Sequence, residues 1–122
     1  MKLLALALVL IVALLHLWFL VLEMLLWTKP LGLRTFRLTP EFAQASRTLA
    51  ANQGLYNGFL AAGVATGLAL GIGAGEPGRI LCLFSLACVI VAGVFGALTV
   101  SRRILWIQAL PAVLATATLL AA

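Results

Sequence analysis

The chain has 122 residues, of which 65% are hydrophobic and only 9% are charged. Its mean hydropathy is +1.23, which lies outside the range of soluble domains. A soluble protein of this size keeps most of its residues near a surface and cannot hide so many apolar side chains. The composition therefore excludes a soluble catalytic domain and predicts that much of the surface faces lipid.

The net charge is +5, yet the positions of the basic residues argue against nucleic acid as a partner. They stand at the ends of apolar runs, where Lys and Arg set the orientation of spans and meet anionic lipid headgroups. A phosphate-binding surface would instead need clustered charge facing water. We expect membrane lipids as partners and no nucleic acid.

Four apolar runs predict helices over about residues 3–27, 40–73, 80–100 and 104–121. The first run is too long for the apolar core of a signal peptide, and we expect it to be a retained span. Only helices satisfy their backbone groups within one segment in lipid. The fold expected is all-α: a polytopic four-transmembrane-helix bundle, with residues 1–122 forming a single transmembrane domain.

The second helix is predicted to begin before its apolar part. Thr39 is a suitable N-cap, Pro40 suits the first helical position and Glu41 favours the positive end of the helix dipole. A helix from there to Gly73 would be roughly 50 Å long, against about 30 Å of hydrocarbon. Its first turns are expected to project into headgroups or water.

Basic residues predict the orientation in the cell (inner) membrane. Four lie between the apolar parts of the first two helices and two between the last two helices, and the opposite side has only Lys2 and Arg79. The positive-inside rule places the richer side in the cytoplasm and both termini outside. The six residues are Lys29, Arg34, Arg37, Arg47, Arg102 and Arg103.

Small residues predict where the helices pack, because they let backbones approach closely in lipid. The second helix has five glycines in such a ladder, and the third has a shorter series of small residues. These are Gly54, Gly58, Gly63, Gly67 and Gly71, then Cys88, Ala92 and Gly96. Cys82 and Cys88 lie on different faces of one helix and cannot bridge each other, and no disulfide or metal site is expected.

Polar side chains in the apolar runs gather in one membrane half, because alternate helices run in opposite directions. Placing a polar side chain in the hydrocarbon core costs free energy, so each such residue is expected to have a structural or functional role. They are Glu23, Asn52, Gln53, Tyr56, Asn57, Thr99 and Gln108, with Arg47 before them and His16 on the first helix. We regard these nine residues as the candidate ligand-binding site.

Two interpretations of this cluster remain open. Glu23 either bonds the amides of the second helix and fixes helix register, or contributes to a pocket that binds a cation or moves a proton. His16 is either a packing residue or a ligand, separated from Glu23 by a water or a bound molecule. Gln108 is either part of the pocket or a clamp beside the kink that Pro111 introduces.

The cluster carries a family resemblance. The stretches 52–63 (NQGLYNGFLAAG), 91–99 and 108–112, together with His16 and Glu23, resemble the domain-of-unknown-function family numbered 1304. That family comprises small, mostly bacterial membrane proteins with four helices. The resemblance covers nearly the whole chain and implies the same architecture, but no activity.

A second resemblance is to the membrane-associated eicosanoid and glutathione metabolism superfamily. It rests on Glu23, the basic loop, the Pro40-Glu41 start, Arg47 before Asn52, and Gln108 to Ala112. It implies a homotrimer, outside termini and glutathione held between subunits with Arg47 as a partner. The chain departs from that pattern, because no arginine lies inside the last helix.

Three functions are compatible with these patterns. The first is a membrane module, a helical bundle that we expect to self-associate as a small homo-oligomer, which binds or transports a small polar or amphipathic ligand at the cluster. The second is a glutathione-dependent enzyme acting on a lipophilic substrate. The third is a structural subunit of a larger membrane complex. Whether the protein is an enzyme is left open by the sequence, and its cofactor, if it has one, is unknown apart from the glutathione that the second resemblance implies.

Overall fold

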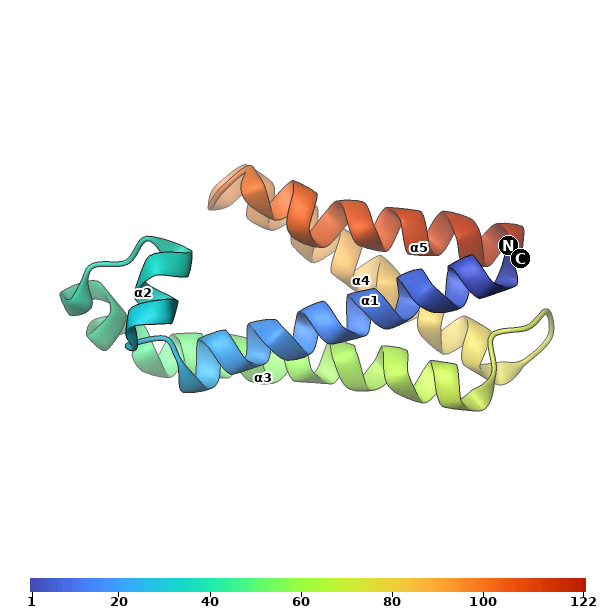
Figure 1. The fold of residues 1–122 in the computed structure, drawn as a ribbon, viewed down its shortest axis with the longest axis horizontal. Helices are drawn as coiled ribbons and strands as arrows, with labels where there is room; N and C mark the ends of the chain where they lie inside the picture. Colours follow the sequence, from blue (N-terminus) through green and yellow to red (C-terminus); the bar gives the residue numbers. More distant parts are fainter. The chain divides into compact units, whose positions relative to one another are not determined.

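The computed structural model describes all 122 residues and contains only helices, which confirms the all-α prediction. The elements in chain order are α1 (Lys2–Leu20), the π-helix η1 (Val21–Leu25), α2 (Pro30–Phe36), α3 (Pro40–Leu70), α4 (Pro77–Thr99), the π-helix η2 (Leu105–Ala109) and α5 (Leu110–Ala121) (Figure 1). The helix α2 and both π-helices are absent from the sequence prediction.

Two helical segments are long and apolar enough to cross a membrane. They are Lys2–Leu25, which comprises α1 and η1, and Pro77–Thr99, which is α4. The apolar helical segment Leu105–Ala121 is shorter. The prediction of two further spans, in α3 and in η2 with α5, therefore stays a prediction.

The helix α3 begins with the cap expected from the sequence. It starts at Pro40, and the amide of Phe42 donates a hydrogen bond of 3.2 Å to Thr39 Oγ1. It ends at Leu70, three residues before the expected end, because Gly71 adopts φ +94°. That left-handed conformation suits glycine, ends the helix and starts the turn to α4.

The fold divides into two units, and α1 and α3 contribute residues to both. One unit comprises Met1–Leu15 with Leu60–Ala122, and the other His16–Phe59. The first unit contains the hydrophobic core, and α4 and α5 are in contact there (Figure 1). Its buried residues are Ala5, Val9, Val12, Ala13, Val64, Ile72, Cys82, Leu86, Val89, Ala112, Ala115 and Leu119.

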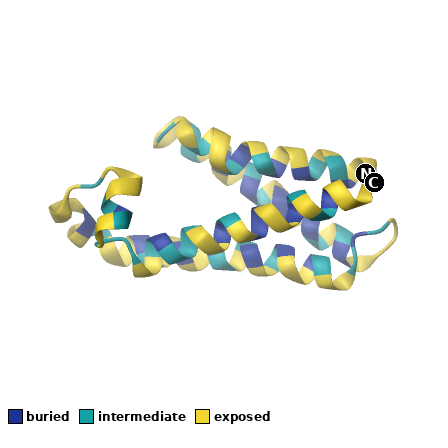
Figure 2. Ribbon diagram, viewed as in Figure 1, coloured by how far each residue is buried: buried dark blue, intermediate teal, exposed yellow.

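Large apolar side chains are also exposed along the helices of the first unit, as the exposed positions in Figure 2 illustrate. Leu3 is 80% exposed and Leu98 is 82% exposed. A monomeric soluble protein rarely presents contiguous apolar surface of this extent. The helices thus bury a stripe of small and branched residues and turn their bulkier apolar residues outward.

In the first unit α3 and α4 pack through small residues. A Cβ atom added at Gly67 would lie 2.5 Å from Cys82 Sγ and 2.8 Å from the Gly78 carbonyl oxygen. One at Gly63 would lie 2.6 Å from Ser85 Oγ. The glycines predicted to pack on α3 therefore do contact α4. Their partners there are Gly78, Cys82 and Ser85.

The face of α4 that the sequence prediction selected does not form this contact. Ala92 is exposed, and Cys88 is only partly buried. A Cβ atom at Gly96 would lie 3.1 Å from Ile104 Cγ2, in the segment that follows α4. The choice of Cys88, Ala92 and Gly96 as a packing series was wrong because small size alone does not say which face of a helix a neighbour covers.

Arg79 fastens the end of the first unit where α3 and α5 finish. Its Nη1 donates to the Ile72 carbonyl at 3.2 Å, and its Nη2 donates to the Leu120 carbonyl at 3.5 Å. Carbonyl groups at helix C-terminal ends lack intrahelical partners and carry partial negative charge. Arg79, near the start of α4, therefore joins the turn after α3 to the last turn of α5.

The second unit contains α2, which folds back onto the turn after η1. Gly32 lies against the backbone of Leu26, where any side chain would clash with the Leu26 carbonyl. Trp27 Nε1 donates to Ser46 Oγ on α3 at 3.0 Å, and its ring packs on Phe36 with centroids 4.9 Å apart. Trp27 thus ties η1, α2 and α3 together.

Candidate functional site

Glu23 lies in the middle of η1, the π-helical turn that continues α1. A π-turn inserts an extra residue into the helical repeat, and such turns occur frequently at functional sites. The turn ends at Leu26, whose amide donates to the Val21 carbonyl at 3.1 Å. The single acidic residue of this apolar segment therefore stands on irregular backbone.

The carboxylate of Glu23 accepts a hydrogen bond from the side-chain amide of Asn57 on α3. Asn57 is only 6% exposed. A buried amide without a partner would be destabilising, so the two side chains depend on each other. The Asn57 amide is neutral, so this hydrogen bond brings no positive charge to the carboxyl group of Glu23.

Glycines on α3 allow η1 to approach closely enough for this bond. A Cβ atom at Gly54 would lie 3.0 Å from Glu23 Cβ and 2.7 Å from Met24 Cγ. One at Gly58 would lie 2.7 Å from Leu20 Cδ1. Gly54 and Gly58 flank Asn57 along the helix, and they place its amide against the backbone turn that carries Glu23.

The other polar residues of α3 are exposed. Asn52, Gln53 and Arg47 all lie on the outside of the second unit. Tyr56 is 52% exposed and packs on Phe59 with ring centroids 5.8 Å apart. The structure therefore brings one amide of the predicted cluster to Glu23 and directs the others away from the protein interior.

His16 is 1% exposed and meets Phe19 edge to face, with ring centroids 5.2 Å apart. His16 and Glu23 are seven residues apart, a separation that predicts a shared helix face at 3.6 residues per turn. That count does not carry across η1, because a π-turn changes the angular position of the residues in it. His16 is thus a buried residue of α1 before the π-turn.

Thr99 and Gln108 belong to the other unit. Thr99 is exposed and donates to the Phe95 carbonyl at 2.7 Å, within its own helix. Gln108 is partly buried and lies in η2, three residues before Pro111. Gln108 and Glu23 each lie in a π-helical turn. Hydropathy patterns do not reveal this shared feature.

No group of three or more His, Cys, Asp or Glu residues is gathered as a multi-ligand metal centre would require. What the site offers is one carboxyl group and one buried side-chain amide that donates a hydrogen bond to it. Such a set can bind a cation or an amine, or accept a proton. It contains no nucleophile paired with a base.

Comparison with known proteins decides the family. Residues 10–120 match the family described as "Protein of unknown function (DUF1304)". The chain belongs to this family. The match includes η1, α3 and both residues of the Glu23–Asn57 pair, and it confirms the first resemblance drawn from the sequence. No match is found among the curated proteins or among the solved structures.

The DUF1304 assignment leaves the second resemblance without support, since none of the comparisons finds the eicosanoid and glutathione superfamily. Arg47, which that resemblance gave to glutathione, is exposed on the first turns of α3. The two residues singled out by the geometry, Glu23 and Asn57, do not depend on that resemblance.

Proposed function

We propose that this DUF1304 protein is a multi-pass membrane protein that binds a small cation or amine at Glu23 and Asn57. The observation that carries the proposal is the hydrogen bond between these two side chains, in a chain with two helices long and apolar enough to cross a membrane. An ionisable side chain inside such a segment is a functional-site hypothesis by default.

Membrane insertion with four spans is part of the proposal. Apolar side chains cover the outside of α1, α4 and α5, as the exposure of Leu3, Leu14 and Phe84 illustrates. The glycine-mediated approach of α3 to α4 is the type of contact that holds helices together in lipid. Both termini lie outside and the Arg102–Arg103 turn is cytoplasmic, in agreement with the positive-inside rule.

The chemistry of the pair defines the ligand class. The Glu23 carboxylate receives one hydrogen bond from a neutral amide, and a carboxylate has further lone pairs for a second donor. A cation or a protonated amine would supply the missing positive charge.

Thermal unfolding of the detergent-purified protein tests the site. The probes are sodium chloride and methylammonium chloride, with choline chloride at equal ionic strength as the control for salt effects. A ligand that binds only the folded state raises the unfolding temperature with its concentration. We expect one of the two small cations to stabilise the wild type more than choline does.

The decisive variant is Glu23→Gln, which keeps a side chain able to bond Asn57 but removes the carboxylate. We expect it to fold and to lose the cation-specific stabilisation. Glu41→Gln is the matched control, because Glu41 is an exposed acidic residue at the start of α3. If Glu23→Gln responds to the cations as the wild type does, Glu23 serves packing alone and the proposed function is wrong.

A further inference from the structure

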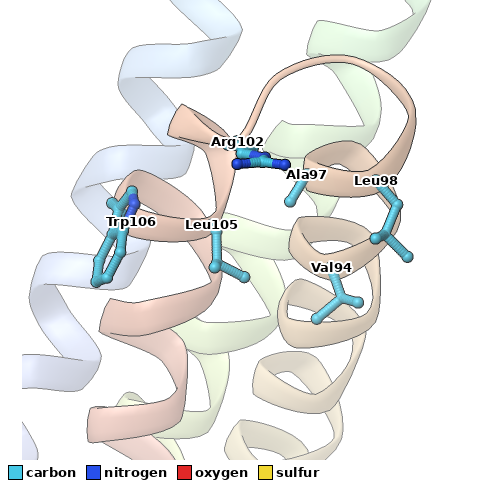
Figure 3. A pocket seen from close by; sticks show the side chains of 6 residues that line it. All are labelled: Val94, Ala97, Leu98, Arg102, Leu105 and Trp106. Atoms are coloured by element: carbon cyan, nitrogen blue, oxygen red, sulfur yellow. The ribbon is translucent and has the colours of Figure 1, made fainter.

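The structure holds a pocket away from Glu23, at the turn between α4 and η2. It has a volume of about 410 Å³ and is lined by Val94, Ala97, Leu98, Arg102, Leu105 and Trp106. Figure 3 shows the Arg102 side chain at the turn end of the pocket, reaching toward Ala97, while Leu105 and Val94 lie below it on the two neighbouring helices. One end is therefore cationic and the remainder is apolar.

A second hollow of about 250 Å³ continues this pocket along the same seam. It shares Val94, Leu105 and Trp106 with the first, and it adds Ala109, Leu110 and Val113. Together the two hollows form an apolar groove between α4 and the η2–α5 segment, with Arg102 at one end. We call it the α4–α5 groove.

The charge around the groove is of one sign. Arg102 and Arg103 stand together in the turn, and the segment 77–122 contains no acidic residue. The three acidic residues of the chain are Glu23, Glu41 and Glu76. The guanidinium of Arg102 thus has no carboxylate partner on the elements that form the groove, and it is available to an anion from outside the protein.

We propose that the α4–α5 groove binds one anionic glycerophospholipid. Its phosphate lies at Arg102, and an acyl chain lies along Val94, Leu105 and Val113. The groove has a basic end where the cytoplasmic headgroups are expected, and its apolar part runs from there along α4 and α5. These two features distinguish it from the rest of the lipid-facing surface. Basic pockets between helices on the cytoplasmic side are typical sites for anionic headgroups. The proposal rests on the membrane insertion assumed above, but not on ligand binding at Glu23.

Trp106 provides the readout, because it lines both parts of the groove. In a variant with Trp18→Phe and Trp27→Phe it is the only tryptophan, since the chain has three. This variant is reconstituted in phosphatidylcholine vesicles that contain increasing brominated phosphatidylglycerol or, separately, brominated phosphatidylcholine. Bromine quenches tryptophan fluorescence on contact. We expect quenching by the anionic lipid to saturate at a lower mole fraction than quenching by the zwitterionic one.

Three substitutions locate the site. Arg102→Gln should raise the half-saturating mole fraction of phosphatidylglycerol about fivefold, the effect of about 1 kcal/mol per basic residue near an anionic surface. Arg103→Gln is the matched control, since Arg103 has the same charge in the same turn but does not line the pocket. Ala97→Phe should abolish the lipid preference by filling the groove while both arginines remain.

Several results would overturn the proposal. Equal quenching by both lipids would mean that only unselective boundary lipid touches Trp106. Equal effects of Arg102→Gln and Arg103→Gln would assign the preference to the charge of the turn as a whole. Absence of quenching together with disulfide-linked dimers of a Leu98→Cys variant would mean that a second copy covers the groove. A protein that alkaline carbonate washes off the vesicles would instead contradict the membrane insertion in the proposed function.

Discussion

Asn57 on α3 donates its side-chain hydrogen bond to the carboxylate of Glu23, which stands in the π-turn at the end of α1. The bond joins residues 34 positions apart in the chain. Two glycines on α3, at positions 54 and 58, allow the approach. A polar contact and a small-residue contact therefore occupy the same stretch of α3, and substitutions can separate their contributions.

Replacement of Glu23 by alanine should destabilise the fold by about 1–3 kcal/mol, because it leaves the buried Asn57 amide without its acceptor. Glu23→Gln should cost less than about 1 kcal/mol, since a side-chain oxygen remains for that amide. Denaturation of the detergent-purified variants in sodium dodecyl sulfate measures both values. Glu41→Ala, at an exposed position, is the reference. Equal stability of Glu23→Ala and wild type would mean that the bond contributes nothing.

Replacement of Gly67 by leucine should destabilise the contact between α3 and α4 by 1–3 kcal/mol or more, the usual order for overpacking. The reason is that even a Cβ atom at Gly67 would lie 2.8 Å from the backbone oxygen of Gly78. Ala69→Leu is the control on the same helix, because Ala69 is exposed. Unfolding of the two purified variants gives the comparison, and the contact is refuted if both lose the same stability.

Replacement of Arg79 by glutamine should loosen the chain end of the first unit. The guanidinium bonds the carbonyls of Ile72 and Leu120, and hydrogen bonds to charged groups contribute about 1.5–3 kcal/mol each when buried, less where water competes. We expect faster amide hydrogen exchange in the last turn of α5 and unchanged exchange in η1. Arg34→Gln, in α2, should leave both regions unchanged. Slow exchange in both variants would show that Arg79 does not hold the end of α5.

Cysteine labelling tests the four-span topology. In a variant with Cys82 and Cys88 replaced by alanine, single cysteines at positions 41 and 103 should react with a membrane-impermeant maleimide only from the cytoplasmic side. Cysteines at positions 76 and 122 should react only from outside, because α3 and α5 then cross the bilayer. Labelling of positions 41 and 76 from the same side would remove α3 from the set of spans.

The helical class and the start of α3 were predictable from the sequence, since hydropathy and the Thr39-Pro40-Glu41 pattern act locally. The pairing of Glu23 with an amide of α3 was one of two interpretations, and the family motif 52–63 directed attention to the correct turn. Which amide would form the bond was not predictable. Asn52, Gln53 and Asn57 look alike in the sequence, and only the approach of η1 at Gly54 and Gly58 selects Asn57.

The features that were missed depend on contacts between segments distant in sequence or on backbone detail. Neither π-turn has a signal in apolar periodicity, although Pro111, the second residue of α5 after η2, marks a place where a backbone donor is lacking. The short helix α2 was taken as a loop, because seven residues are too few for a periodic pattern. Pro30 is the first residue of α2, and a proline at the first helical position is the signal that could have found this helix.

Carbodiimide labelling of membranes that contain the protein tests the central claim, that Glu23 lies inside the bilayer at a site lined by Asn57. Dicyclohexylcarbodiimide partitions into lipid and reacts with carboxyl groups there, whereas a water-soluble carbodiimide reaches only carboxyl groups in contact with water. Peptide mass spectrometry should find the lipid-soluble reagent on Glu23, and the water-soluble one on Glu41 and Glu76 but not on Glu23. Modification of Glu23 by the water-soluble reagent as fast as Glu76 would contradict the account.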